Sequence, residues 1–400
     1  MKQKEKSSRK QLVPNLRFPD FQNAGDWDLD YFENLTFTIT PTRKIPSSQY
    51  LTAGTFPIVD QSQNFICGWT NNEELIITNQ LPLIVFGDHT CIVKLINFPF
   101  AQGADGIKII GVNPSLNTLF LYQYLLYDPV IQEEYKRHFS LLREKFVSFP
   151  SLPEQKKIAD CLSSLDELIQ FQTKKLEVVQ SHKKGLLQNL FPAEGETVPR
   201  LRFPEFEGTG DWVERKLGEV CVAELREVAK PTERYLGLGI RSHGKGTFQK
   251  LEQDPKGNSM DVLYQVHEND LIVSITFAWE GAIAIASRED HGGLVSHRFP
   301  TYVFKHEETI SNFFRYIITK KSFVYKLGLI SPGGAGRNRV MNKKDFHELK
   351  EYFSSLPEQQ RIADCLSSVD ALIQEQLDAL EKLKTHKKGL LQGLFPVMGE

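Results

Sequence analysis

The sequence predicts an α+β protein in which two β-rich globular domains are separated by two long helices that form an antiparallel coiled coil. A segment of 41 residues at 152–192 returns at 356–396 with 28 positions identical. A second repeat, VPNLRFPDFQNAGDW at 13–27, returns as VPRLRFPEFEGTGDW at 198–212. The segments between these repeats share little sequence. The chain is therefore a tandem repeat with pseudo-twofold symmetry, in which constant segments frame two divergent ones.

Both copies of the 41-residue repeat carry the signals of a long helix. Ser151 and Ser355 are N-cap candidates, and the Leu-Pro-Glu-Gln that follows each of them puts proline near the first helical position. Apolar residues then recur with steps of four and three, a period of 3.5 that indicates a coiled-coil seam. The predicted seam consists of Ile158, Leu162, Leu165, Ile169, Gln172 and Leu176 in the first helix and of Ile362, Leu366, Val369, Ile373, Gln376 and Leu380 in the second.

A seam this narrow on a helix of ~35 residues, roughly 50 Å long, needs a partner helix of equal length. The other copy of the repeat is the expected partner. Gln172 and Gln376 occupy the same seam position, and a buried polar residue there fixes register and partner at a cost in stability. The alternative is that each helix packs separately on its own globular neighbour.

The two repeats divide the chain into six segments. These are a basic flexible tail at 1–12, a globular domain at 13–150, a spacer helix at 151–192, a linker at 193–199, a globular domain at 200–355 and a spacer helix at 356–396. We call the two globular domains the first body and the second body. Short apolar runs broken by Pro, Gly and Asn predict strands in both. In the second body, the expected strands include 235–240, 270–286 and 298–304.

The composition is that of a soluble, well-packed protein, with 40% hydrophobic and 11% aromatic residues. No apolar run reaches the ~18 residues of a membrane span, and the first residues lack a signal-peptide core, so we expect a cytoplasmic protein. Five cysteines without C-x-x-C spacing argue against disulfides and metal sites. The net charge of −2 does not favour a nucleic-acid partner. It is compatible with DNA binding if the basic surface is local and partner subunits supply much of the phosphate contact.

Two stretches come close to enzyme motifs but lack a group that the chemistry needs. Gly239–Gly246 fits a phosphate-binding loop, yet Gly246 stands where Ser or Thr must offer a hydroxyl to magnesium. Asn97–Phe100 reads NFPF, where an amino-methyltransferase needs a Pro-Pro-aromatic loop. We therefore expect a non-catalytic chain that holds no metal and no cofactor of its own.

The two long helices and the LRFP-[DE]-F entry of each body make the chain similar to the DNA-specificity subunit of type I restriction-modification systems. The resemblance covers everything after the basic tail. It implies that each body is a target recognition domain that reads one half of a bipartite site in double-stranded DNA. It also implies that the coiled coil spaces the two domains and docks modification subunits, two in number.

The same resemblance assigns the chemistry to partner chains. Methylation of adenine, which uses S-adenosylmethionine, would belong to the modification subunits. ATP-driven translocation and magnesium-dependent cleavage would belong to restriction subunits. No membrane partner is implied.

Direct reading of bases favours Arg or Lys for guanine and Asn or Gln for adenine. The candidate residues in the second body are Arg337, Asn338 and Arg339 in a glycine-rich segment, Arg241, His243 and Lys245 in the turn at 239–246, and Arg298. The candidates in the first body are His89, Gln102, Asp105 and Lys108. The same side chains could contact phosphates alone. In the first body, Asp and His could also serve backbone geometry in turns.

A function of a different class fits the same pattern. The chain could be a scaffold that joins two protein partners through its coiled coil, with the bodies binding proteins or peptides. Constant spacers around divergent bodies favour DNA reading, because exchangeable recognition needs constant docking surfaces. A gel-shift assay with random-sequence duplex and the modification subunit separates the two functions.

Overall fold

The computed structural model describes residues 12–41, 43–78, 80–104, 106–133, 137–334 and 339–397. The predicted basic tail, apart from its last residue, lies outside the described residues. The chain divides into two compact units: unit 1 contains Met1–Lys175 and Gln376–Glu400, and unit 2 contains Leu176–Glu375. Each unit holds one body and part of each long helix. The compact units therefore differ from the contiguous domains that the repeats predict.

The first body consists of short strands and short helices. Its strands are β1 (Asp28–Tyr31), β2 (Thr36–Ile39), β3 (Phe56–Val59), β4 (Gly68–Thr70), β5 (Ile76–Ile77), β6 (Leu83–Gly87), β7 (Val93–Ile96), β8 (Phe100–Gln102), β9 (Ile107–Val112) and β10 (Phe146–Phe149). Its helices are η1 (Pro19–Phe21), α1 (Phe32–Leu35), η2 (Ser47–Gln49), η3 (Glu73–Leu75), α2 (Thr118–Tyr127) and α3 (Phe139–Arg143).

The second body is longer and follows a similar order of elements. Its strands are β11 (Val213–Lys216), β12 (Cys221–Ala223), β13 (Glu227–Ala229), β14 (Tyr235–Ile240), β15 (Thr247–Gln253), β16 (Val262–Gln265), β17 (Leu271–Val273), β18 (Ile283–Ile285), β19 (Leu294–Val295), β20 (Thr301–Phe304) and β21 (Lys350–Phe353). Its helices are η4 (Pro204–Phe206), α5 (Leu217–Val220), η5 (Pro255–Gly257), η6 (Ala278–Glu280), η7 (Arg288–Asp290), α6 (Ser311–Ile317), α7 (Lys321–Leu329) and α8 (Lys343–Glu348).

The two bodies share one strand topology although their sequences have diverged. The first body contains the sheets β2-β9-β6-β7 and β4-β3-β8-β5, and the second contains β12-β20-β17-β18 and β13-β16-β19-β14-β15. The pair β3 and β8 is parallel, as is the pair β14 and β19. The neighbours of these strands are antiparallel in both bodies. Apart from the added edge strand β13, the second body therefore repeats the sheets of the first strand for strand.

One stretch of the second body folds differently from the sequence prediction. The segment 270–286, predicted as one strand, forms the two antiparallel strands β17 and β18 with η6 between them. Gly281 ends η6 with φ 71°, a left-handed conformation that glycine adopts without a steric penalty. Both strands are fully buried, so the apolar pattern runs on through the turn and conceals it.

The repeated motifs build the same joint at the start of each long helix, α4 (Leu152–Asn189) and α9 (Leu356–Leu394). In unit 1, Arg17 donates through Nε and Nη2 to the two carboxylate oxygens of Glu154, both at 2.7 Å. In unit 2, Arg202 donates in the same way to Glu358, both at 2.8 Å. Each carboxylate is 1% exposed, so these bidentate pairs are desolvated as well as charge-assisted.

The glutamine after each glutamate ties the helix to its own body. Gln155 Nε2 donates to Ser115 O at 3.0 Å, and Gln359 Nε2 donates to Glu308 O at 3.1 Å. The LRFP entry and the LPEQ helix start therefore recur because they form the two sides of one repeated joint.

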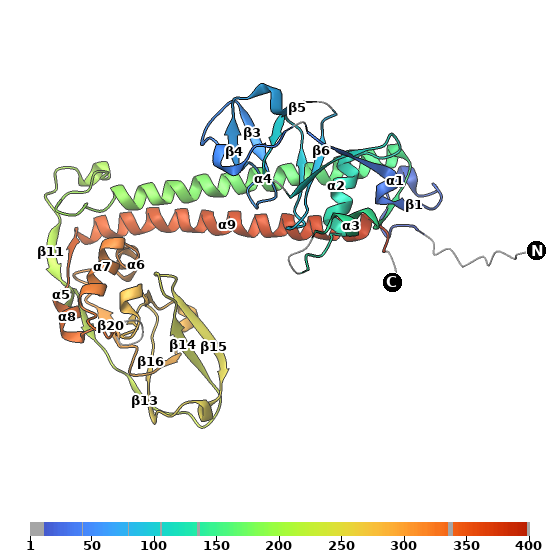
Figure 1. The fold of residues 1–400 in the computed structure, drawn as a ribbon. Coiled ribbons are helices and arrows are strands. Elements are labelled where there is room, and N and C mark those ends of the chain that lie inside the picture. Colours follow the sequence, from blue (N-terminus) through green and yellow to red (C-terminus); the bar gives the residue numbers. More distant parts are fainter. Residues whose placement is uncertain are drawn as a thin grey trace, which may run out of the picture. The chain divides into compact units, whose positions relative to one another are not determined.

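Within each unit the two long helices run antiparallel, as predicted for a coiled coil (Figure 1). In unit 1, Gln172 Nε2 donates to Gln376 Oε1 at 2.7 Å, and Asp166 pairs with Lys387 at 2.5 Å. Residues earlier in α4 therefore face residues later in α9, which shows that the two helices are antiparallel. In unit 2 the repeat mates of the ion pair, Lys183 and Asp370, also meet at 2.5 Å.

The predicted seam residues are buried to different degrees. Seven are buried, namely Ile158, Leu162, Leu176, Ile362, Leu366, Gln376 and Leu380. Five are half-buried, namely Leu165, Ile169, Gln172, Val369 and Ile373. The first two residues of each seam pack into a body's core, whereas Gln172 and Gln376 contact each other across the helix pair. The two alternatives for the helices therefore each hold along part of the length.

The core of unit 1 is closed by a segment that comes from the far end of the sequence. Ile158 and Leu162, from the start of α4, belong to the same cluster as Leu394 and Phe395, at the end of α9. Phe395 is fully buried, and its ring stacks on Tyr127 with centroids 5.2 Å apart. The first body is therefore incomplete without residues near 395.

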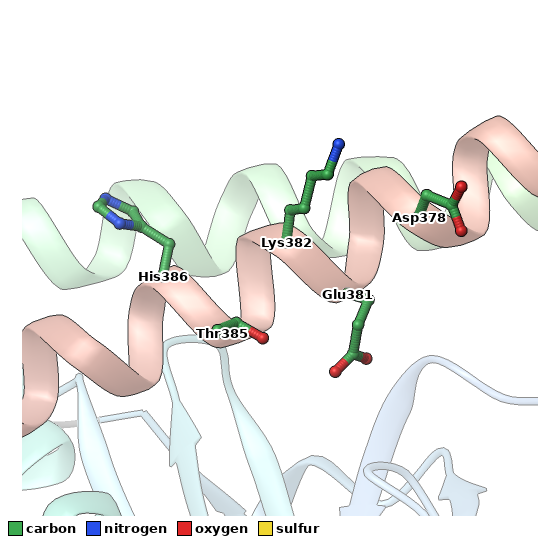
Figure 2. Close-up of a pocket in the computed structure, with 5 residues that line it drawn as sticks. All are labelled: Asp378, Glu381, Lys382, Thr385 and His386. Carbon is green, nitrogen blue, oxygen red and sulfur yellow. The ribbon is translucent and has the colours of Figure 1, made fainter.

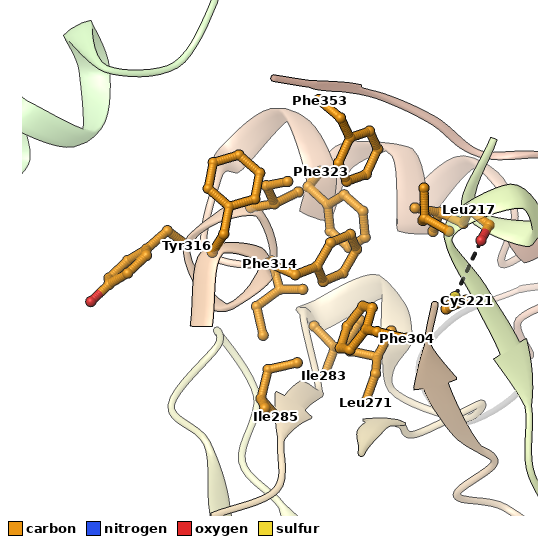
Figure 3. Packing of buried hydrophobic residues seen from close by; sticks show 14 of the residues in the cluster. Leu217, Cys221, Leu271, Ile283, Ile285, Phe304, Phe314, Tyr316, Phe323 and Phe353 are labelled. Atoms are coloured by element: carbon orange, nitrogen blue, oxygen red, sulfur yellow. Dashed lines mark hydrogen bonds between the residues drawn. The ribbon is translucent and has the colours of Figure 1, made fainter. Parts of the chain in front are cut away.

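The core of unit 2 is built in the corresponding way. Phe191, just after α4, is 2% exposed and stacks on Phe313 with ring centroids 5.3 Å apart. Figure 3 shows the aromatic part of this core, with Phe323 close to Phe314 and the Tyr316 side chain directed away from them. The rings of Phe314 and Phe353 are almost parallel, with centroids 6.3 Å apart. The outward hydroxyl of Tyr316 donates to Asp370 of α9 at 3.0 Å. The helix pair and the second body therefore share one core.

Candidate nucleic-acid interface

Several candidate residues of the second body meet around the β17–β18 connection, Ser274–Ala282. The hairpin loop Arg241–Gly246, between β14 and β15, rests on it: His243 N donates to Glu280 O at 2.7 Å and Gly244 N donates to Gly281 O at 2.9 Å. A side-chain bond from Ser242 Oγ to Glu280 Oε2 at 2.8 Å adds to these. The hairpin loop is therefore held firmly against the connection.

Arg298 and Arg339 reach the same connection from other parts of the sequence. Ile275 N donates to Arg298 O at 3.0 Å, which brings in the β19–β20 connection. The Arg339 guanidinium lies 4.8 Å from the centre of the Trp279 ring, and Met341 N donates to Ile275 O at 2.7 Å. Three groups of cationic candidates that lie far apart in the sequence are thus neighbours in the fold.

The hairpin loop carries exposed cationic and imidazole side chains. Arg241, His243 and Lys245 are all exposed. The Arg241 guanidinium lies 5.4 Å from the centre of the Phe248 ring, and Lys250 Nζ lies 5.7 Å from it, so two cations lie close to this aromatic ring. Lys250 was not among the residues predicted from the sequence.

A glycine on the neighbouring strand makes room for this aromatic group. Gly239 pairs with Phe248 across the β14–β15 ladder, and a Cβ at position 239 would lie 2.3 Å from the ring. Glycine is therefore required for Phe248 to lie across the strand pair. The spacing Gly239 to Phe248 is a signal by which this cluster could be found in the sequence.

Arg339 is a candidate for DNA contact, and it also stabilises the backbone around the end of α7. Its Nε donates to Ser331 O at 3.2 Å, and its Nη2 donates to Gly328 O at 2.9 Å near the end of α7. Two nitrogens of the guanidinium are therefore committed to backbone carbonyls. The neighbouring candidates Arg337 and Asn338 lie outside the described residues.

The first body brings the same three connections together. Its hairpin loop Asp60–Cys67, between β3 and β4, rests on the β6–β7 turn: Thr90 Oγ1 donates to Gln61 O at 2.9 Å. The β8–β9 connection joins them, because Asp88 N donates to Gly106 O at 2.7 Å. The positions correspond to the β14–β15 loop, the β17–β18 connection and the β19–β20 connection of the second body.

The candidates predicted for the first body are not grouped on one exposed surface. His89 is half-buried, and its backbone carbonyl accepts from Gln132 Nε2 at 3.0 Å. Lys108 lies within β9 rather than in a connection, with Nζ 5.4 Å from the centre of the Phe139 ring. Asp105 lies outside the described residues.

The predicted exposure of Gln102 is wrong. Gln102 was expected on an exposed strand-to-strand connection, but it is the last residue of β8 and is 3% exposed. Strand β8 lies between β3 and β5 inside its sheet. The Gln102 side chain is therefore buried and does not lie at the surface where DNA could be read.

At least one residue of the GDHT turn, Gly87–Thr90, stabilises the local backbone. The Asp88 side chain is buried, and its Oδ1 accepts from Phe139 N at 2.9 Å at the start of α3. The Asp88 carbonyl accepts from His138 N at 2.8 Å. Asp88 therefore anchors α3 to the turn, which agrees with the alternative explanation for the acidic and imidazole residues of this segment.

The hairpin loop of the first body and the lysine beneath it were not among the residues predicted from the sequence. Lys94 is 4% exposed, and its Nζ donates to Asp60 O at 2.8 Å and to Asn64 O at 2.6 Å. Burial lowers the pKa of this ammonium group, and Asp60 opposes the effect. The exposed residues Gln63 and Asn64 follow from the sequence DQSQN, a polar run between two apolar strand segments.

The described part of the chain has neither a metal-binding cluster nor a membrane-spanning helix. No group of three or more His, Cys, Asp or Glu residues there lies close enough together to hold a metal ion. Among the helices of that part, none combines the length and the apolar character needed to cross a membrane.

Known proteins resemble both halves of the chain. The family model described as "Type I restriction modification DNA specificity domain" matches residues 36–181 and 209–382. The type I restriction enzyme MjaVIII specificity subunit of Methanocaldococcus jannaschii is 24% identical over 263 residues, which are 62% of this chain and 61% of that protein. The MjaX protein of the same organism, whose name also describes a type I restriction enzyme specificity subunit, is 27% identical over 266 residues, 64% of this chain and 59% of that protein. The matches thus span about three fifths of the length of these relatives.

A solved structure extends the likeness to the whole fold. The type I restriction-modification system S subunit from M. genitalium superposes with a TM-score of 0.66 over 97% of this chain and 100% of that chain, at 16% sequence identity. At that identity the likeness concerns the fold alone. Because the family model matches each body together with most of the long helix that follows it, this chain belongs to the type I restriction-modification DNA specificity family.

Proposed function

We propose that the chain is the DNA-recognition subunit of a type I restriction-modification complex, in which each body reads one half of a bipartite site. The observation that carries the proposal is the pair of bodies with one topology and one arrangement of three connections but different loop side chains. A constant frame with variable loops suits a protein that must read two unrelated half-sequences. The bidentate joints and the shared cores hold each frame to the helix pair.

In this proposal the helix pair sets the spacer between the half-sites and docks two modification subunits. Leu168 and Phe171 on α4 support docking, because they are 52% and 67% exposed on a helix whose seam lies elsewhere. On α9 in unit 1, a shallow hollow of polar side chains adds a second surface. Figure 2 shows Lys382 and His386 on one side of the helix and Glu381 and Thr385 on the other.

The chemical steps belong to partner chains in this proposal. The modification subunits would supply S-adenosylmethionine and transfer its methyl group to adenine. Restriction subunits would supply translocation and cleavage with ATP and magnesium. The role of this chain is to place the partners on the correct DNA sequence.

The proposal is tested by lengthening both helices by one heptad. This insertion keeps the seam in register and adds about 10 Å of helix at 1.5 Å per residue. Along DNA, at 3.4 Å per base pair, that is at most ~3 base pairs. We expect the methylated motif in cells that carry the variant system to keep both half-sequences while the gap between them grows by one to a few base pairs.

Two results would contradict the proposal. An active variant with an unchanged gap would show that the helices do not set the spacer. Altered half-sequences would show that recognition is not confined to the bodies. DNA bending can absorb part of the added length, so the increase can fall below the geometric limit.

A further inference from the structure

We propose that the hairpin loop Asp60–Cys67 is the base-reading loop of the first body, and that the side-chain amides of Gln63 and Asn64 read adenine. The inference rests on the proposed function, because it assigns a role within DNA reading. Its first support is topological. The loop joins β3 to β4 in the same way that Arg241–Gly246 joins β14 to β15. The parallel neighbours of β3 and β14, which are β8 and β19, also correspond to each other.

The second support is that both loops rest on the same neighbour. In the first body, His89 N donates to Gln61 Oε1 at 3.3 Å and Thr90 Oγ1 donates to Gln61 O at 2.9 Å, so the loop sits on the β6–β7 turn. In the second body, His243 N donates to Glu280 O on the corresponding β17–β18 connection. The two loops are therefore equivalent in position as well as in connectivity.

The third support is that the loop is held in one shape from beneath. The Lys94 ammonium joins Asp60 O and Asn64 O, at the two ends of the polar run, and Ser62 N donates to Asp60 Oδ1 at 2.8 Å. A buried charge with two carbonyl partners is costly to move. Lys94 is therefore a positioning residue that presets the loop before it meets a ligand, which lowers the entropy lost on binding.

The fourth support is the chemistry that this loop offers to solvent. Gln63 and Asn64 are exposed, and neither side chain has a hydrogen-bond partner among the described residues. A side-chain amide carries one acceptor and one donor group, which match N6 and N7 of adenine in the major groove. The corresponding loop of the second body carries Arg241 and Lys245 instead, which suit guanine or phosphate.

The test maps the methylated motif in cells that carry the system with Gln63→Ala/Asn64→Ala. We expect one A·T position in one half-sequence to become degenerate, with a loss of discrimination of about tenfold or more, while the other half-sequence stays intact. The double variant Gln22→Ala/Asn23→Ala is a matched control, because it removes the same exposed dipeptide from the entry segment of the first body. The control should methylate the parental motif.

Arg241→Ala shows which half-sequence belongs to which body, since it should affect the half that Gln63→Ala/Asn64→Ala leaves intact. A second variant, Gln63→Glu/Asn64→Asp, keeps the size of both side chains while removing their N–H donors, and it should relax the same position. Thermal unfolding of each purified full chain checks that the fold is kept. If a variant no longer methylates, selection from a random duplex library by the assembled complex replaces the motif map.

The outcomes separate this inference from the proposed function. An unchanged motif in the Gln63→Ala/Asn64→Ala variant, or a relaxed position that is G·C, overturns the role of the loop. A change in the half-sequence that Arg241→Ala also alters overturns it as well. If the parental protein itself yields an undivided motif or none, the proposed function fails, whatever the loop variants do.

Discussion

The two bodies of this chain differ in the chemistry of their corresponding loops and agree in almost everything that supports those loops. The first body offers Gln63 and Asn64 on its β3–β4 loop, and the second offers Arg241 and Lys245 on its β14–β15 loop. Beneath them the sheets have the same strand order and the same parallel pair. The frame therefore depends on backbone pairing and a few buried contacts, so that exposed loop residues are free to change.

The largest expected effect concerns the interleaved helix ends. Phe395→Ala should destabilise unit 1, and Phe191→Ala should destabilise unit 2, each by ~3–5 kcal/mol, because both rings are buried in aromatic cores. Hydrogen exchange measures this locally, through the amides of β6 in unit 1 and of β17 in unit 2. Each variant serves as the control for the other. Loss of protection in β17 with Phe395→Ala, while β6 stays protected, would contradict the assignment of Phe395 to the core of unit 1.

An intermediate effect concerns the cationic loop of the second body. Arg241→Ala should weaken binding of the assembled complex to its cognate DNA by ~1–3 kcal/mol if the guanidinium reads a base, with little change on unrelated DNA. Arg234→Ala is the control, because Arg234 is exposed just before β14 whereas Arg241 follows its last residue. Equal losses on both DNAs would make Arg241 a phosphate contact and weaken the contrast between the loops.

The smallest effect concerns a difference inside the repeated joint. Trp212 Nε1 donates to Glu358 Oε1 at 3.4 Å, whereas the buried Nε1 of Trp27 has no hydrogen-bond partner among the described residues. Trp212→Phe should therefore cost ~0.5–1.5 kcal/mol more than Trp27→Phe, the difference that one hydrogen bond makes. Chemical denaturation of the two single variants measures it. Equal costs would mean that the two joints are energetically alike.

The helices were predictable from sequence because their signals are local and periodic. The 3.5-residue spacing from Ile158 to Leu176 and its repeat predicted the helix pair, and the Gln172–Gln376 contact lies where the spacing put it. The sequence could not show that Phe395 closes the core of the first body. Nothing in a local pattern tells a helix end which distant core will receive it.

The candidate site was predictable only in part, because exposure depends on tertiary packing. The turn with Arg241, His243 and Lys245 was found from its glycines and charges, and it is exposed. Gln102 was chosen for its chemistry, but the fold buries its side chain. Gln63 and Asn64 were overlooked because amides between two strand runs look like ordinary turn residues. Whether any of these residues contacts DNA stays a prediction.

The interleaving of the helix ends has a consequence for the order in which the protein folds during synthesis. Unit 2 is contiguous, from Leu176 to Glu375, whereas unit 1 also needs Gln376–Glu400. The ribosome finishes synthesising residues 13–150 long before it makes Phe395, and at roughly 5–20 residues per second the wait lasts at least ten seconds or so. We therefore expect unit 2 to reach its native state first, although most of unit 1 leaves the ribosome earlier. During that interval the unfilled Phe395 site of the nascent first body is where a chaperone would be needed.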